Sequence, residues 1–596
     1  MKLKKYILAV IAVIFLAGTN SFAAPEGNFH KLLKEYTFHP DGIIEFHYNK
    51  ELTINSHLAL NNLYGETFII YNPEYQELKF NTAYTKQADG QIINMPQNAF
   101  NEVLPSEAAD APAYNGMKEM VVTHTGLELG ATIYLDYTIF TKPGYYKNLD
   151  IDELLQEDSP VKDYTLIINI PENETLNYTL SNSNSKPSIS EKARMKQYRW
   201  TIKNIPAANR EPFQPENHDN SIRLTANQYP SQQEALENLR QILDKPLNDE
   251  GRNFTQNLIK DEKTEREKIL AIQQYVLTQV ANTGLTLENT GYQTRTPSQV
   301  FRSSYGTAAE KTSLLAAMLR AAGFQPEFVA VFPAGTKNTS RGLASIKALS
   351  VMVNANQIPL FLSATRQPSI SPELRGNRDE IWLISEKNIR PLTVINGEAI
   401  INTSSKIRLN PSQAQTEASI RIKGGIIPTS PQKATESAIK SYSSPFGQAQ
   451  SVEVKLALPQ EALLTFQANQ KLESGNGHLI YKLPSTNKGI NSWWMSTLNT
   501  ERTSMTELPY ALKEQNEYEI TLEPGMELKT PPVQIRKEFP VGKVNISFMQ
   551  EGDKLKVNRE IEISKTLLTP TEYKDFRTLL NIWTNPNTET LVIGIR

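Results

Sequence analysis

The spacing of hydrophobic residues divides the chain into three zones, and the first is predicted to be β-rich. From residue 24 to 230, apolar and polar positions tend to alternate, most clearly over 130–140, where every second residue from Ile133 to Ile139 is large and apolar. A period of two predicts strands with one buried face. Similar runs at 43–54 and 164–170 follow the same pattern. We therefore predict a β-sandwich-like N-terminal domain over 24–230.

Over residues 231–391 the hydrophobic period lengthens to that of a helix. Ile269, Ile272 and Val276 lie at helical spacing, and a second apolar helix from Leu314 should end at Gly323. Short apolar runs typical of strands follow, at 328–332, 349–353, 360–362 and 381–384. Helices followed by strands predict an α+β unit.

The remainder is again β-rich, and we divide it into a region over 392–515 and a C-terminal β domain over 516–596. Thr569 and Glu572 form a capping box that predicts a helix over 573–580. A final strand is expected at 591–595. The stretch 412–451, rich in Ser, Thr, Gln and Ala, could hold a loop or a helix. The whole chain is thus predicted to be multidomain α+β.

Composition narrows the classes of function. The 596 residues carry 62 basic and 64 acidic side chains, so no basic excess points to nucleic acid. There is no cysteine, which excludes disulfides, thiolate metal sites and cysteine nucleophiles. A basic start, an apolar run over 6–18 and the small residues Ser21 and Ala23 predict that 1–23 is a signal peptide. We expect a periplasmic or secreted chain with no lipid-anchoring cysteine and no later transmembrane span.

The sharpest motif lies in the middle zone, where residues 305–311 read YGTAAEK and 314–323 read LLAAMLRAAG. Together with 295–301 they resemble the core of bacterial transglutaminase-like domains, in which a Gly-Asp-Cys-Lys-Asp-Lys type of segment opens a helix. The N-terminal zone and the last eighty or so residues resemble β domains that accompany such cores in secreted bacterial proteins. The resemblance implies a papain-like α+β core.

The resemblance also implies a Cys-His-Asp site for acyl transfer or amide hydrolysis through a thioester. In this sequence the three matching positions hold Ala308, Ala348 and Ser363. None of the seven histidines lies between His218 and His478, so a shifted alignment supplies no imidazole to the core. We therefore predict a pseudoenzyme with no cofactor and no metal site. Its former substrate groove, with Tyr305, Ala308 and Ser363, is expected to bind an unidentified peptide, protein or glycan.

Two other functions remain open. The first is a hydrolase that uses surviving side chains such as Ser350, Ser363 or Glu310, although no familiar spacing of base and nucleophile supports it. The second is a structural scaffold within an envelope assembly.

Two weaker signals receive structural interpretations. His39, His47 and His57 could ligate zinc, but ordinary surface or strand histidines are favoured. The acidic stretch from Asp150 to Asp158 lacks the glycine of an EF-hand loop, and we interpret it as a solvated loop.

Overall fold

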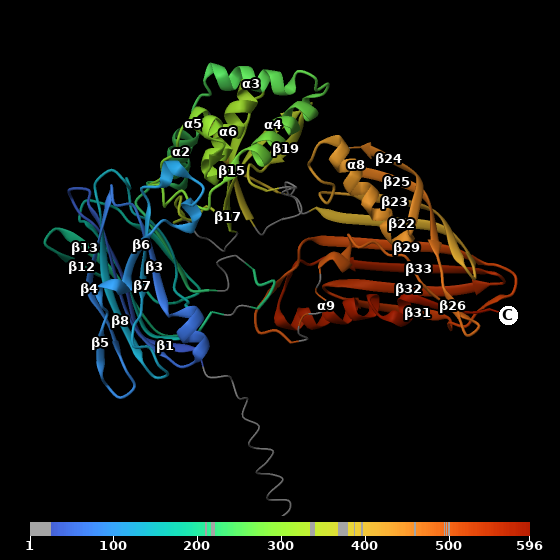
Figure 1. The fold of residues 1–596 in the computed structure, drawn as a ribbon, viewed down its shortest axis with the longest axis horizontal. Helices are drawn as coiled ribbons and strands as arrows, with labels where there is room; N and C mark the ends of the chain where they lie inside the picture. The colour runs from blue at the N-terminus through green and yellow to red at the C-terminus, as the bar shows by residue number, and fades with distance from the viewer. Residues whose placement is uncertain are drawn as a thin grey trace, which may run out of the picture.

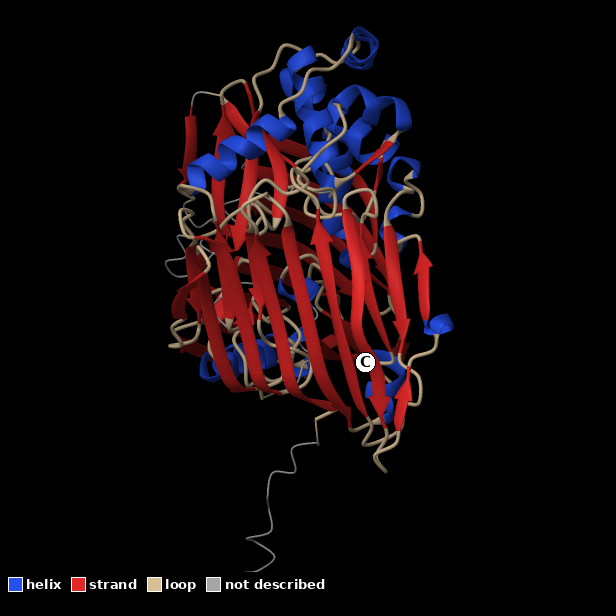
Figure 2. Ribbon diagram, turned by 90° about the vertical axis from the view of Figure 1, so that its left-hand side faces the viewer, coloured by secondary structure: helices blue, strands red, loops and turns tan. Residues whose placement is uncertain are grey.

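The computed structural model has three units that follow the zones of the sequence (Figure 1). It describes residues 25–208, 211–215, 221–333, 340–366, 379–386, 388–394, 397–457, 461–493, 495, 498 and 501–595. The predicted signal peptide and His218 therefore lie outside the described residues. Helices gather in the middle unit, whereas long strands dominate the other two (Figure 2).

The N-terminal unit is built on an eight-stranded sheet. Its order is β12 (Ser188–Lys192), β13 (Met195–Ile205), β10 (Val161–Pro171), β1 (Gly27–Phe38), β2 (Ile44–Ile54), β8 (Thr132–Thr141), β4 (Gln76–Lys86) and β5 (Ile92–Asn94). Neighbours are antiparallel except β1 and β10. The turn between β1 and β2 uses Gly42 at a φ of 84°, a conformation that glycine adopts without strain.

Two smaller sheets cover the same unit. One contains β3 (Glu66–Tyr71), β7 (Lys118–Thr123) and β6 (Phe100–Val103), and the other contains β11 (Asn177–Ser181), β14 (Arg223–Asn227) and β9 (Asp150–Leu154). Ile133, Leu135, Tyr137 and Ile139 of β8 are buried, as their alternation predicts. They share one core with residues of the smaller sheets such as Val122, so the predicted sandwich-like packing is confirmed.

The middle unit is the expected α+β core. Its helices are α2 (Gln232–Leu243), α3 (Asp249–Ile259), α4 (Glu265–Gln279), α5 (Pro297–Ser303) and α6 (Ala308–Ala321). Its antiparallel sheet has the order β19 (Ile358–Leu362), β18 (Ala348–Ala355), β17 (Glu327–Pro333), β20 (Asp379–Ser385) and β21 (Asn388–Leu392). The short strands β15 (Ala281–Asn282) and β16 (Tyr305–Gly306) pair beside it. Helix α6 is buried along nearly its whole length and packs against α4 and β18.

The C-terminal unit also has an eight-stranded sheet. Its order is β24 (Gln448–Ala457), β25 (Glu461–Lys471), β23 (Gln413–Lys423), β22 (Glu398–Asn410), β29 (Ala511–Leu522), β33 (Lys554–Ile563), β32 (Gly542–Glu551) and β31 (Val533–Phe539). A second sheet has the order β26 (Ser474–Gly475), β27 (His478–Lys482), β35 (Thr590–Ile595) and β30 (Met526–Leu528). The unit also contains α8 (Gln432–Lys440), α9 (Pro570–Trp583), α10 (Pro586–Glu589) and the paired β28 (Thr506–Glu507) and β34 (Leu567–Leu568).

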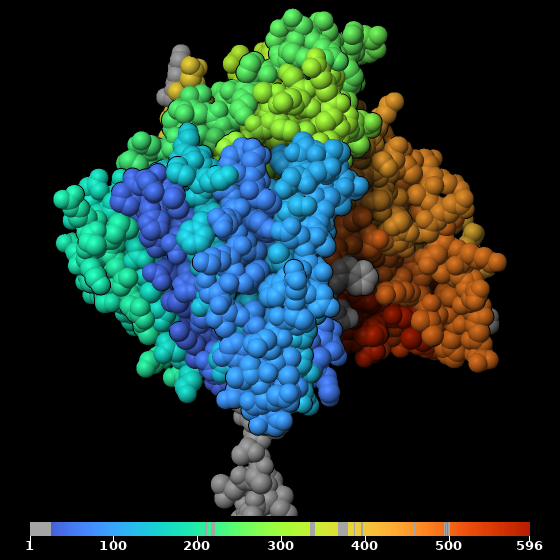
Figure 3. Space-filling model, turned by 60° about the vertical axis from the view of Figure 1, so that its left-hand side comes forward, coloured from blue at the N-terminus to red at the C-terminus, as the bar shows by residue number. Residues whose placement is uncertain are grey.

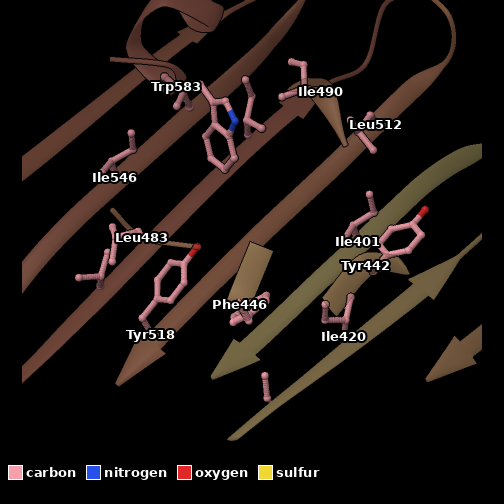
Figure 4. Packing of buried hydrophobic residues seen from close by; sticks show 14 of the residues in the cluster. Ile401, Ile420, Tyr442, Phe446, Leu483, Ile490, Leu512, Tyr518, Ile546 and Trp583 are labelled. Carbon is pink, nitrogen blue, oxygen red and sulfur yellow. The ribbon is translucent and has the colours of Figure 1, made fainter. Parts of the chain in front are cut away.

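This unit is continuous across the boundary that we placed between residues 515 and 516. That boundary falls inside β29, which pairs in parallel with β22 over its length. Ile401 and Ile420 from before the boundary pack in the same core as Ile546 and Trp583 from after it (Figure 4). The structure therefore joins the two predicted regions in one sheet and one core.

Local sequence signals in the C-terminal unit have mixed outcomes. The Thr569–Glu572 capping box is formed and begins α9, and β35 is the predicted last strand. The ambiguous stretch 412–451 holds β23, α8 and the start of β24, so it is neither only a loop nor only a helix.

The interpretation of the acidic stretch as a solvated loop is wrong for its first half. Asp150 to Leu154 form β9, which pairs with β14. Asp152 forms an ion pair with Arg223, and Glu153 forms one with Lys34 at 2.7 Å. These acids are therefore part of the packed structure, because neighbouring basic groups offset the cost of their partial burial.

Hydrogen bonds join all three units, which lie against one another in the space-filling view (Figure 3). Glu211 of the N-terminal unit accepts from Thr503 N at 3.0 Å in the C-terminal unit. Arg266 of the core donates to the Ser430 carbonyl of the C-terminal unit at 3.3 Å. Within the described ranges, no helix combines the length and apolar character that crossing a bilayer requires.

Candidate functional site

The start of α6 is the point where the family nucleophile would stand. Thr307 caps the helix. Its hydroxyl accepts from Glu310 N at 3.2 Å, and the Glu310 carboxylate accepts from Thr307 N at 3.0 Å. Ala308 is the first residue of the helix and is exposed. The helix dipole would favour a thiolate at this position, but a methyl group offers nothing to ionise.

The other two matching positions lie at one edge of the neighbouring sheet. Ala348 is exposed at the first position of β18, and Ser363 directly follows the last residue of β19. The two strands are antiparallel, so the start of β18 and the end of β19 meet at the same edge. Because α6 packs on β18, the structure brings the three predicted positions onto adjacent elements.

The Ser363 side chain accepts hydrogen bonds from the backbone of its own loop. Its Oγ accepts from Thr365 N at 3.2 Å and from Arg366 N at 3.0 Å. Its carbonyl accepts from Gln273 Nε2 of α4 at 3.0 Å. The side chain therefore closes a turn after β19, as short hydroxyl side chains commonly do.

Tyr305 connects the core to the N-terminal domain. Its hydroxyl accepts from Ala113 N at 2.7 Å, in the 3₁₀ turn Pro112–Tyr114. The guanidinium of Arg295 lies 4.5 Å from the centre of the Tyr305 ring, which is a cation–π contact. The sequence predicts Tyr305 as a groove residue, and the structure shows it in this interdomain contact.

Glu310 is the centre of the same contact and is fully buried. Its carboxylate accepts from Tyr114 Oη at 2.6 Å, and from Arg295 Nε and Nη2, each at 3.0 Å. Burial by itself would raise the pKa of Glu310, but the bonds from Arg295 and Tyr114 outweigh it and hold the pKa below its usual value. A carboxylate so stabilised is a poor proton acceptor.

Lys311 is a second buried charged residue next to the site. Its Nζ donates to the Val280 carbonyl at 2.7 Å, and burial lowers its pKa to about 8. The amine therefore holds the end of α4 and points into the protein. The roles of Tyr114, Arg295 and Lys311 were not predicted from the sequence, because none of them belongs to the expected triad.

The backbone at the start of α6 thus provides a positive helix end, and the three predicted positions hold Ala308, Ala348 and Ser363. The described histidines lie elsewhere: His39 bonds to Glu45 and His47 bonds to Asp136, both within the N-terminal domain. His39 lies in the turn after β1 and His47 on β2, which fits the interpretation of both as ordinary surface or strand histidines. Losing one member of a catalytic triad costs orders of magnitude in turnover.

Three family models match separate parts of the chain. Residues 252–356 match the transglutaminase-like superfamily. Residues 40–209 match a domain of unknown function, DUF3857, and residues 478–593 match another, DUF3858. Ala308 and Ala348 lie within the middle match, and Ser363 lies just beyond it.

A solved structure similar over the whole chain has the same architecture. It is a protein of Parabacteroides distasonis ATCC 8503 described as a "putative protease", with 36% identity and a TM-score of 0.77. The similarity covers 96% of this chain and 100% of that one. A search of curated proteins gives no match.

Two further solved structures are only distantly similar. A "putative cysteine protease" from Cytophaga hutchinsonii has 12% identity and a TM-score of 0.18, over 37% of this chain and 75% of that one. An M1 zinc metallopeptidase mutant from Deinococcus radiodurans has 9% identity and a TM-score of 0.19, over 34% and 42%. Similarity this low carries no functional argument.

Proposed function

Because the chain belongs to the transglutaminase-like superfamily, we propose that it is a non-catalytic member that binds a peptide, protein or glycan at the start of α6. The observation that carries this proposal is the replacement of all three expected catalytic residues by Ala308, Ala348 and Ser363. With no cysteine in the chain and no histidine between residues 218 and 478, the core has neither the thiolate nor the imidazole of the family reaction.

Exposure at two of these positions supports a binding role. Ala308 and Ala348 are both exposed, at the start of α6 and of β18. The formed capping box keeps the helix end in place, so the backbone geometry of the site survives without its chemistry. Short side chains also leave space for a partner to approach the helix end, where the dipole favours a negative or hydrogen-bond-accepting group.

The same proposal includes export. Residues 1–23 have the charge and apolar pattern of a signal peptide, and we propose that the mature chain begins at Ala24 in the periplasm or outside the cell. The intact mass of the protein recovered from a bacterial host is the measurement. A chain starting at Ala24 is expected, and an exported chain that keeps its first 23 residues would contradict export through this signal.

A scaffold is the second candidate, and the interdomain contacts favour it. Tyr114 of the N-terminal domain bonds to Glu310 of the core, and Tyr305 bonds back to Ala113. These bonds tie the N-terminal domain to the start of α6. A rigid multidomain body of this kind could present several surfaces to one assembly. Co-purification with one fixed partner, insensitive to changes at Ala308, would favour this function.

The hydrolase alternative has less support. Glu310 is fully paired and its pKa is lowered, and the Ser363 hydroxyl accepts two backbone bonds. Ser350 lies on β18 opposite Val329 in the sheet register. None of these arrangements pairs a nucleophile with a base.

A bulky substitution at the start of α6 tests the binding proposal. The mature chain and its Ala308→Trp variant would be compared on peptide and glycan arrays and in pull-downs from envelope extracts. We expect the variant to lose about tenfold or more in affinity, because the indole would fill the approach to the helix end.

Ala434→Trp is the matched control, since Ala434 is an exposed helical alanine of α8 in the C-terminal unit. It should bind like the unchanged chain. If Ala308→Trp retains every interaction at full affinity, the start of α6 is not the binding surface.

A further inference from the structure

A cavity of about 320 Å³ lies where the N-terminal domain meets the core. Strands β1, β2 and β8 contribute Tyr36, Phe46 and Ile139 to its wall, and a core loop contributes Glu288 and Tyr292. The volume is at the lower end of the range of small-molecule sites, which commonly lie at domain interfaces. Ala308, Ala348 and Ser363 do not line it, so the cavity is distinct from the start of α6.

Glu288 is the acidic group of this cavity that has no partner. Glu288 is an exposed residue, and part of it lines the cavity. Across the described ranges, no hydrogen bond or ion pair is made to its carboxylate, and no described lining residue is Lys or Arg. Neighbouring protein atoms and then the negative charges of Glu153 and Asp152 raise its pKa above its ordinary value. A bound cation would supply the missing counter-charge.

The loop that carries Glu288 is held in position by the N-terminal domain. Tyr146 Oη donates to the Glu288 carbonyl at 3.4 Å, and Tyr145 Oη donates to the Asn289 carbonyl at 2.6 Å. Gly291 has a φ of 64° and packs so closely on the Tyr145 ring that a Cβ would overlap it. These contacts fix the loop, so the carboxylate is presented by a preorganised backbone.

Aromatic rings form much of the wall. Tyr146 and Tyr292 meet edge to face with ring centres 6.0 Å apart, and Tyr36 lies 4.8 Å from Phe46. All four residues line the cavity. The faces of tyrosine and phenylalanine rings attract organic cations, and they do so more strongly where water is excluded.

Two buried polar atoms of residues that line the cavity have no hydrogen-bond partner within the described structure. They are Oδ1 of Asp150 and the hydroxyl of Tyr292, both inaccessible to solvent. Asp150 is held by its other oxygen, which accepts from Leu343 N at 2.6 Å. Buried groups of this kind are normally satisfied, and a second acid here makes the cavity more favourable for a positive ligand.

We propose that this cavity binds a small organic cation, namely a primary ammonium compound with a short apolar body. Glu288 is the counter-ion, and the rings of Tyr36, Tyr146 and Tyr292 enclose the cationic and apolar parts. The proposal goes beyond the binding surface at α6 and does not depend on it.

The test compares two linear probes of equal length. Isothermal titration of the full mature chain would use 1,5-diaminopentane and its neutral counterpart 1,5-pentanediol. We expect saturable binding of the diamine and none of the diol. Glu288→Gln should lower the affinity for the diamine by about tenfold or more, since it removes the counter-ion.

Glu191→Gln is the matched control, because Glu191 is an exposed acid on the outermost strand β12. It should leave the diamine affinity unchanged. Thermal unfolding checks that each variant folds, and Glu288→Asp replaces Glu288→Gln if the latter does not, with weaker binding again expected. Equal binding of the diol, undiminished affinity in the Glu288 variant, or no heat from the diamine at millimolar concentration would each overturn the proposal.

Discussion

At the scale of single residues, buried charges hold the units together more than they perform chemistry. Glu310 shows this clearly, because its carboxylate receives bonds from both the N-terminal domain and the core. Removing one partner of such a buried pair leaves an uncompensated charge, which is far more costly than losing an exposed ion pair. The residue that could have served as a base is therefore better explained as a structural connection.

Glu514 in the C-terminal unit gives a pH-dependent prediction. It is fully buried and accepts from Ile490 N at 3.1 Å and Asn516 Nδ2 at 3.3 Å. Burial raises its pKa from 4.5 to about 7, despite these bonds. Between those values the folded chain holds a proton that the unfolded chain has lost. The free energy of unfolding therefore falls as pH rises through this window and levels off above it.

Glu514→Gln should remove this decline. Relative to the unchanged chain, the variant is expected to gain stability from pH 5 to pH 8, by about 3 kcal/mol at most. Urea unfolding at the two pH values is the measurement. Glu191→Gln, which changes an exposed acid, is the control and should show no such trend. A difference between variant and unchanged chain that stays constant with pH would contradict a raised pKa at Glu514.

At the scale of elements, local sequence signals predicted individual helices well, but they did not predict which distant strands pair. The helices at 269–276, 314–322 and 573–580 were predicted from spacing and capping, and they correspond to α4, α6 and α9. The junction within β29 was missed, because an alternating strand specifies a buried face but not its neighbour. A parallel pairing between β22 and β29 joins segments about a hundred residues apart, which no local pattern reveals.

For the candidate site, too, the motif predicted some residues, whereas the contacts between domains were not predicted. Ala308, Ala348 and Ser363 were placed by motif, and the structure puts them on adjacent elements. The bond from Ala113 to Tyr305 spans 192 residues of sequence, and the loop of Glu288 meets an N-terminal domain more than a hundred residues away. Contacts of this kind depend on how domains pack, so the sequence alone could not predict them.

The capping box of α6 is expected to stabilise the start of the helix. Thr307→Ala removes the hydroxyl that accepts from Glu310 N, and it should lower the free energy of unfolding by about 1 kcal/mol. Thr569→Ala in the equivalent box of α9 is the matched comparison and should cost a similar amount. Urea unfolding measures both. A neutral effect of Thr307→Ala would show that the cap does not stabilise the helix end.

At the scale of the whole molecule, the chain is a transglutaminase-like protein whose core lies between two β-rich units. The 36% identity to a protein of the same architecture covers nearly the entire length, so the arrangement of domains is a shared property. Fold and reaction are separable, because a fold positions side chains and only particular side chains react. We propose that this chain retains the fold without the reaction, because it has no cysteine and no histidine between residues 218 and 478.

Turnover by the purified wild-type chain tests this account most directly. The mature protein would be incubated with a glutamine-containing peptide and a primary amine, and mass spectrometry would follow amine incorporation, deamidation and peptide cleavage. The account predicts no product above a protein-free control, because neither a thiolate nor a core imidazole exists. Product formation that scales with protein concentration and disappears on substitution of Glu310, Ser350 or Ser363 would contradict it.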